Sequence, residues 1–110
     1  MATKDPREPF TRLSPDEAKT MQDNGAVVID VREMHEWTSG HVPNATHIPV
    51  NSVYARREEL PKDADLLFIC AVGQRSALAA EMAAAAGLTR LYNIEGGTDA
   101  WIRAGLPVEK

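Results

Sequence analysis

One cysteine, Cys70, ends a short apolar run, and a turn that contains glycine follows it at once. The run over residues 66–69 predicts a buried strand, and the alanine-rich stretch from residue 76 predicts a helix. The thiolate is the nucleophilic form of cysteine, and backbone N–H groups at the start of a helix stabilise negative charge. The pattern therefore predicts a loop that activates the sulfur of Cys70 and holds an anionic substrate.

We expect the substrate to be bound by the residues that directly follow the cysteine. A glycine in this segment permits backbone angles that a side chain would resist, so that several N–H groups can turn inward. An arginine adds a permanent cation, and the helix behind the loop contributes roughly half a positive charge at its start. The predicted binding residues are Ala71, Val72, Gly73, Gln74, Arg75 and Ser76, with Ser76 or a neighbour as the start of the helix.

A cysteine at the end of a strand is often only a small buried core residue. That interpretation of Cys70 requires no glycine turn, no arginine and no helix start behind the cysteine, and all three follow it here. We therefore interpret Cys70 as a catalytic nucleophile.

Composition limits the classes of protein and partner. The chain has 110 residues, of which 44% are hydrophobic and 25% charged, so we expect one globular domain with one core. A net charge of -4, with lysines and arginines scattered along the chain, argues against nucleic acid as a partner. No apolar stretch is long enough to cross a bilayer, and the first residues lack the pattern of a secretory signal. We expect a cytoplasmic protein with no membrane contact and, from its size, a monomer.

Histidine spacing does not favour a metal site. His35, His41 and His47 are separated by equal steps of six, which match neither one face of a helix nor a usual zinc spacing. We expect these histidines to make ordinary polar or capping contacts, and we expect the protein to bind no metal.

The elements that must position the loop alternate between strand and helix. A serine, a proline and a glutamate at positions 14, 15 and 17 predict a capped helix start, and the β-branched run at 26–31 predicts a strand buried on both faces. We expect residues 1–9 to form a flexible arm and residues 10–110 a single domain. The expected strands lie near 10–13 and at 26–31, 46–48, 66–69 and 91–94, and the expected helices at 15–24, 33–39, 50–60, 76–86 and 98–104.

This alternation favours an α/β fold with a largely parallel sheet. In open parallel sheets, ligands gather outside the carboxyl ends of the strands. Cys70 follows such an end, so its position in the predicted fold agrees with its predicted chemistry.

Three stretches, at 28–45, 70–76 and 92–101, resemble the signatures of the rhodanese-like domain family in their order and spacing. The resemblance implies a small three-layer α/β sandwich, in which helices flank a mostly parallel sheet. It identifies Cys70 with the family's sulfur-accepting cysteine and the residues from Cys70 to Arg75 with its six-residue active-site loop. Four further residues match fingerprint positions that are chiefly structural: Asp30, Arg32, His41 and Trp101.

The activity that this resemblance implies is sulfur transfer through a persulfide on Cys70, without a metal or organic cofactor. A small anionic donor such as thiosulfate would supply the sulfur, and cyanide or a thiol would accept it. Arg75 could pair with the sulfonate oxygens of the donor.

Two alternatives remain open at this stage. One is a partner-dependent sulfur-relay or interaction module, in which a protein donates or accepts the sulfur and small molecules turn over little. The other is a phosphatase or arsenate reductase, since rhodanese-like phosphatases also combine a thiolate with an anion-binding loop that ends in arginine. Their loop has five residues between cysteine and arginine, whereas four separate Cys70 from Arg75. We expect the shorter loop to suit a sulfur atom better than a phosphoryl group.

Overall fold

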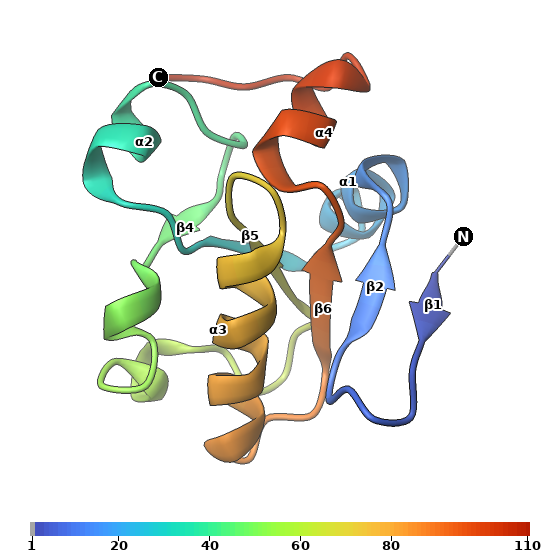
Figure 1. Cartoon of the computed structure of the whole chain (residues 1–110), viewed down its shortest axis with the longest axis vertical. Helices are drawn as coiled ribbons and strands as arrows, with labels where there is room; N and C mark the ends of the chain where they lie inside the picture. The colour runs from blue at the N-terminus through green and yellow to red at the C-terminus, as the bar shows by residue number, and fades with distance from the viewer. Residues whose placement is uncertain (1) are drawn as a thin grey trace.

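A six-stranded sheet forms the middle of the fold in the computed structural model, which describes residues 2–110 (Figure 1). The strand order is β1-β2-β6-β5-β3-β4, and within the described chain every neighbouring pair is parallel except β1 and β2. This arrangement confirms the predicted α/β fold with a mostly parallel sheet. The strands are β1 (Thr3–Lys4), β2 (Thr11–Leu13), β3 (Val27–Asp30), β4 (Thr46–His47), β5 (Leu66–Ile69) and β6 (Leu91–Ile94).

Helices cover both faces of the sheet, so the fold has three layers. The front layer in Figure 1 contains α3, and α1 lies behind the sheet. The helical segments are α1 (Pro15–Asp23), α2 (Met34–Thr38), α3 (Gln74–Ala85) and α4 (Gly97–Arg103), with two 3₁₀ turns, η1 (Val50–Ser52) and η2 (Arg57–Glu59).

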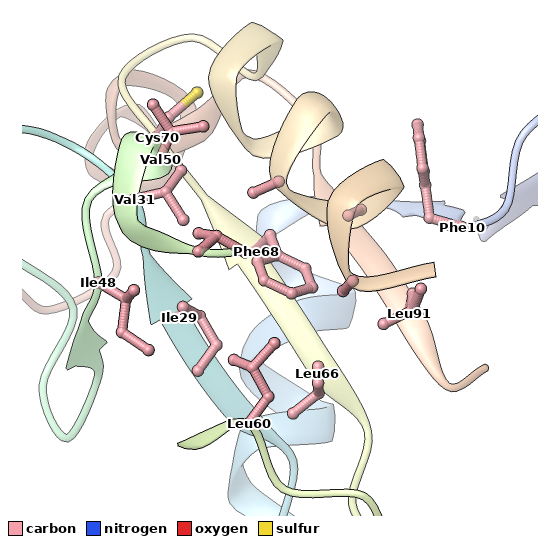
Figure 2. Close-up of a cluster of buried hydrophobic side chains, with 14 residues drawn as sticks. Phe10, Ile29, Val31, Ile48, Val50, Leu60, Leu66, Phe68, Cys70 and Leu91 are labelled. Atoms are coloured by element: carbon pink, nitrogen blue, oxygen red, sulfur yellow. The ribbon is translucent and has the colours of Figure 1, made fainter. Parts of the chain in front are cut away.

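Strand β5 lies between β3 and β6 and is buried on both faces. Its side chains alternate between two hydrophobic clusters, as the pleat of a strand requires. Leu66, Phe68 and the following Cys70 belong to the cluster on the α3 side (Figure 2), whereas Leu67 and Ile69 belong to the cluster that contains Trp101 of α4. The pleat therefore directs Cys70 toward the layer that contains α3.

Helix α3 packs closely on this face because its inward residues are small. Ala79, Ala80 and Ala83 are fully buried, and they belong to the same cluster as Phe68. Alanine also has the highest helix propensity, so these positions favour both the helix and its close contact with the sheet.

The predicted capping of α1 is confirmed. Ser14 Oγ accepts a hydrogen bond from the Glu17 N–H, the Glu17 side chain accepts one from the Ser14 N–H, and Pro15 occupies the first helical position. The two reciprocal bonds satisfy N–H groups that a helix start otherwise leaves without partners.

The prediction of one helix over 50–60 is wrong. Two separate 3₁₀ turns, η1 and η2, occupy this segment, and most of their backbone bonds span three residues, as from the Val53 N–H to the Val50 carbonyl at 3.2 Å. Val50 and Val53 are buried against the α3 cluster. β-Branched residues, asparagine and serine favour helix weakly, so packing of the two valines determines the local conformation.

Residues 2–9, part of the expected arm, include an ordered element. Strand β1 pairs antiparallel with β2, and Glu8 forms an ion pair with Arg12 of β2. The flexibility of this segment stays a prediction.

The start of α4 makes the closest backbone contact beside the cysteine. An ideal Cβ built on Gly97 would lie 2.2 Å from the Cys70 carbonyl oxygen and 2.6 Å from the Ala71 carbonyl carbon. The Thr98 N–H donates to the Cys70 carbonyl at 2.7 Å, and the Asp99 N–H donates to the Ala71 carbonyl at 3.1 Å. Only a residue without a side chain lets the two segments approach this closely.

We predict that Gly97→Ala destabilises the protein by about 3 kcal/mol or more, because the new methyl group meets backbone atoms that cannot move without breaking these bonds. Gly25→Ala is the matched control, since Gly25 also has a positive φ, of 106°, but no atom lies within 4 Å of its Cβ position. We expect the control to lose about 1–2 kcal/mol from backbone strain alone. Urea unfolding measures both values, and equal losses would contradict the close contact.

Candidate active site

Cys70 directly follows β5 at the carboxyl end of the sheet, as the sequence predicts. The residue is 0% exposed and lies in one cluster with Val31 and Val50. Figure 2 shows its sulfur directed away from Phe68, toward the turn that leads into α3. The thiol therefore has apolar side chains on one side and a polar backbone turn on the other.

The turn after Cys70 aims backbone N–H groups at the sulfur. Gly73 adopts φ 105°, a left-handed angle that favours glycine, and directly precedes α3. Its N–H donates to Cys70 Sγ at 3.1 Å. The helix begins at Gln74, two residues earlier than the expected first residue, because Gly73 already provides the turn that starts it.

Two opposing effects act on the pKa of Cys70. Burial raises the pKa of the thiol, whereas hydrogen bonding to Ser76 and the backbone N–H groups of Ser76, Gly73 and Val72 lower it. The hydrogen bonds outweigh burial, so the pKa of Cys70 lies below its ordinary value. A core cysteine surrounded only by apolar side chains would shift in the opposite direction.

Arg75, the last residue of the loop, is bound to a carboxylate. Its two terminal nitrogens donate to the two carboxylate oxygens of Glu36 in α2, at 2.7 and 2.9 Å. Glu36 Oε1 also accepts from the Glu33 N–H at 3.0 Å. The Arg75 guanidinium lowers the pKa of Glu36 to about 2, against the opposing effect of burial. The positive charge that the sequence predicts at this loop is thus neutralised by a residue 39 positions earlier in the chain.

Ser76 is buried in the first turn of α3, with its hydroxyl oxygen 3.4 Å from Cys70 Sγ. The hydroxyl donates to Asn93 Oδ1 in β6. The Asn93 amide nitrogen donates to the Gly73 carbonyl at 3.3 Å and to Glu95 Oε2 at 2.9 Å. A chain of polar contacts therefore connects the sulfur with the end of β6.

The other predicted binding residues contribute in different ways. Ala71 is held through its backbone carbonyl by α4, and Val72 is 56% exposed at the surface. Gln74 is exposed at the first position of α3. The structure thus brings Gly73, Ser76 and the backbone N–H of Val72 to the sulfur, whereas Arg75 is bound to Glu36.

Three residues at this site are missing from the prediction: Glu36, Asn93 and Gly97. Asn93 could have been noticed, because a polar residue interrupts an otherwise apolar strand that is buried between neighbours. The paired glycines at 96 and 97 indicate a tight turn but do not reveal which backbone they approach. Nothing local identifies Glu36, since its partner is distant in sequence.

The four fingerprint residues have structural contacts. Arg32 forms a buried ion pair with Asp30 at 2.8 Å and also donates to the Gly40 carbonyl at 2.7 Å. His41 is bonded through its ring to the Trp37 carbonyl, and the Trp101 indole N–H donates to the Pro107 carbonyl.

Neither a metal site nor a membrane span is found in the described residues. No group of three or more His, Cys, Asp or Glu side chains within 2–110 could hold a metal ion. Across the same residues, each helix is too short or too polar to traverse a bilayer.

Comparisons of the sequence and of the structure with known proteins point to the same family. Residues 14–104 match the Rhodanese-like domain. The chain is 34% identical over 100 residues to the thiosulfate sulfurtransferase GlpE of Ectopseudomonas mendocina (strain ymp), an alignment that covers 91% of each chain.

Solved structures agree with this match. The rhodanese-related protein of Thermoplasma volcanium has a TM-score of 0.82 and 32% identity, over 89% of this chain and 96% of its own. A protein of unknown function from Rhodopseudomonas palustris, described as a possible tyrosine phosphatase, has a TM-score of 0.78 and 30% identity, over 89% of this chain and 83% of its own. The match over residues 14–104 and the shared fold lead to one conclusion: the chain belongs to the rhodanese-like family.

Proposed function

We propose that this protein is a thiosulfate sulfurtransferase in which Cys70 carries the transferred sulfur. The observation that supports this most directly is the hydrogen bond from the Gly73 N–H to Cys70 Sγ, at the start of a helix and at the carboxyl end of a central strand. Relatives named thiosulfate sulfurtransferase, such as that of Ectopseudomonas mendocina, support the choice of donor.

The reaction has two displacement steps. The Cys70 thiolate attacks the outer sulfur of thiosulfate, so that a bond forms between the two sulfurs while the bond to the sulfonate sulfur breaks. Sulfite leaves with the electron pair of the broken bond, and Cys70 becomes a persulfide anion. Cyanide or a thiolate then attacks the terminal sulfur, and the Cys70 thiolate is regenerated. Neither step requires an oxidant or a metal.

The loop residues stabilise the charge that persists through both steps. The N–H groups of Val72, Gly73 and Ser76 surround the sulfur with positive ends of backbone dipoles, which favour first the thiolate and then the persulfide anion. Because Cys70 is 0% exposed, the donor reaches its sulfur only after covering side chains shift.

Arg75 is the candidate group for the sulfonate end of the donor. Its guanidinium can donate two parallel hydrogen bonds to two oxygens of one sulfonate group, but Glu36 already accepts from both of its terminal nitrogens. A sulfonate must therefore displace Glu36 or bind beside it. Glu36 is expected to weaken thiosulfate binding and to leave donors of lower charge less affected.

The persulfide itself is the first prediction of this proposal. After brief incubation with thiosulfate, the intact mass of the wild-type protein should increase by one sulfur atom, and cyanide should remove that atom as thiocyanate. Cys70→Ser should gain no mass, because its hydroxyl is a far weaker nucleophile at neutral pH. A folded wild-type protein with a free thiol and no added sulfur would overturn thiosulfate as donor.

Hydrolysis of an aryl phosphate tests the phosphatase alternative in the same preparations. We expect none, because four residues separate Cys70 from Arg75 and Glu36 binds the arginine. Hydrolysis by wild type that Cys70→Ser abolishes would favour a phosphatase instead.

Glu36→Gln should lower the KM for thiosulfate about three- to ten-fold, since it removes a negative charge from the partner of Arg75, and each tenfold corresponds to about 1.4 kcal/mol. Steady-state thiocyanate formation at low ionic strength measures the effect. Glu59→Gln is the matched control, because Glu59 forms a similar two-point pair with Arg56, on the segment between β4 and β5. An unchanged KM in Glu36→Gln would exclude Arg75 as the binding group for the donor.

The ion pair also predicts a dependence of stability on pH. The pKa of Glu36 is about 2 in the folded protein, below its ordinary value of 4.5, so the folded state favours the ionised carboxylate. This stabilisation is present above pH 4.5 and is lost as the pH falls toward 2. Because both side chains are partly exposed, we expect Glu36→Gln to cost at most about 1 kcal/mol near pH 6.

Urea unfolding of wild type and Glu36→Gln across this pH range checks the expectation. The difference in unfolding free energy should shrink as the pH falls. A difference that stays constant with pH would show that the carboxylate charge contributes nothing.

A sulfur-relay function is the second candidate, and the Arg75–Glu36 pair favours it. A persulfide on another protein brings little charge to the loop, so it would not need a free arginine. Faster loading of Cys70 from a low-charge persulfide than from thiosulfate would favour this candidate.

A further inference from the structure

The hydrogen bonds around Asn93 determine which way its amide group faces. Its nitrogen lies between the Gly73 carbonyl, at 3.3 Å, and Glu95 Oε2, at 2.9 Å. Both of these groups only accept hydrogen bonds, so the position between them requires the NH₂ end of the amide. The oxygen of Asn93 must therefore face Ser76.

This orientation fixes the hydrogen of Ser76. Asn93 and Ser76 are 1% and 0% exposed, so water does not replace their partners. The amide oxygen of Asn93 needs a donor, and the Ser76 hydroxyl supplies its single hydrogen. Toward Cys70 Sγ, 3.4 Å away, Ser76 then presents a lone pair. The thiol S–H can donate to that lone pair. A thiolate cannot, and it gains the hydrogen bond through which Ser76 lowers the pKa of Cys70 only when the hydroxyl turns from Asn93 to the sulfur.

We propose that Asn93 is a positioning residue that competes with the Cys70 thiolate for the hydrogen of Ser76. The competition gives the sulfur different partners in the states of the reaction. In the thiol state, Cys70 donates to Ser76 and Ser76 donates to Asn93, so all three groups have partners. When the thiolate forms, the Ser76 hydroxyl can turn to the sulfur only by leaving the Asn93 oxygen without a donor. If the hydroxyl stays with Asn93, the thiolate lacks this hydrogen bond, and if it turns to the sulfur, the amide oxygen of Asn93 lacks it.

Sulfur loading removes this conflict. In the persulfide the negative charge resides on the terminal sulfur, and Cys70 Sγ carries two covalent bonds and little charge. The Ser76 hydrogen can then return to Asn93. The contact thus favours the loaded state over the free thiolate. This functional meaning rests on the proposed sulfur transfer, whereas the hydrogen-bond direction does not.

Charged residues belong to several of the elements around the sulfur. Arg75 of α3 interacts with Cys70 and is paired with Glu36 of α2. Glu95 lies beyond Asn93, and Asp99 follows the start of α4. Val31, directly after β3, and Val50 of η1 pack in the same cluster as Cys70 and are apolar, and Arg32, which follows Val31, is paired with Asp30. Variants that change only Asn93 and Ser76 leave all of these charges in place.

The test measures the pH dependence of Cys70 alkylation by iodoacetamide in wild type, Asn93→Leu, Ser76→Ala and the double variant. The single cysteine of the chain makes the modified site unambiguous. Asn93→Leu should shift the titration about 0.5 to 1 pH unit lower, because the freed Ser76 hydroxyl donates to the thiolate. In the Ser76→Ala background, Asn93→Leu should cause no further shift, because no hydroxyl remains that could turn to the sulfur.

Two results would overturn the proposal. One is a titration that Asn93→Leu leaves unchanged in folded protein. The other is a shift of the same size with and without the Ser76 hydroxyl, which would mean that Asn93 does not act through Ser76.

A second measurement needs no variant of Asn93, so it remains available if Asn93→Leu does not fold. The infrared S–H stretching band of the only cysteine reports whether the thiol donates a hydrogen bond. We expect this band at lower frequency in wild type than in Ser76→Ala. The same frequency in both proteins would mean that Ser76 does not accept from the thiol, and the proposal would fail. Neither readout uses thiosulfate, so failure of sulfur loading and failure of this inference are separable.

Discussion

The carbonyl oxygens of buried Cys70 and of partly buried Ala71 each need a hydrogen-bond donor. The first residues of α4 supply these donors from Thr98 and Asp99. Gly97 permits the approach because it has no side chain. This contact fixes the backbone at which β5 ends, and the turn that surrounds the sulfur starts from the same two residues. The geometry of the site thus depends on how tightly one helix start fits against the end of one strand.

The fold was largely predictable from the sequence because its signals are local. The apolar run of β5, the capping residues of α1 and the alanines of α3 each indicate their element without reference to the rest of the chain. The prediction of one helix over 50–60 failed because burial of Val50 and Val53 outweighs the helical pattern of the charged residues in this segment. Packing of that kind depends on neighbours that a local pattern does not include.

The candidate site likewise has features that follow from the local sequence and contacts that depend on the folded chain. The position of Cys70 after a buried strand and the left-handed angle of Gly73 follow from residue types and their order. The partners of Arg75 and Ser76 do not, because Glu36 and Asn93 reach them from α2 and β6 across the folded chain. The sequence therefore predicted which groups could react, but not the contacts that set their charge and proton positions.

The N-terminal segment shows how far those contacts extend. Arg12 of β2 is bound by Glu8 and by Glu95, and Glu95 in turn accepts from Asn93. A segment that contains no residue of the loop is thereby connected, through one arginine, to the amide that faces Ser76. The residue at which a recombinant chain begins therefore affects the contacts of Asn93. A form that starts after residue 9 keeps the whole loop but lacks one of the two carboxylates that hold Arg12.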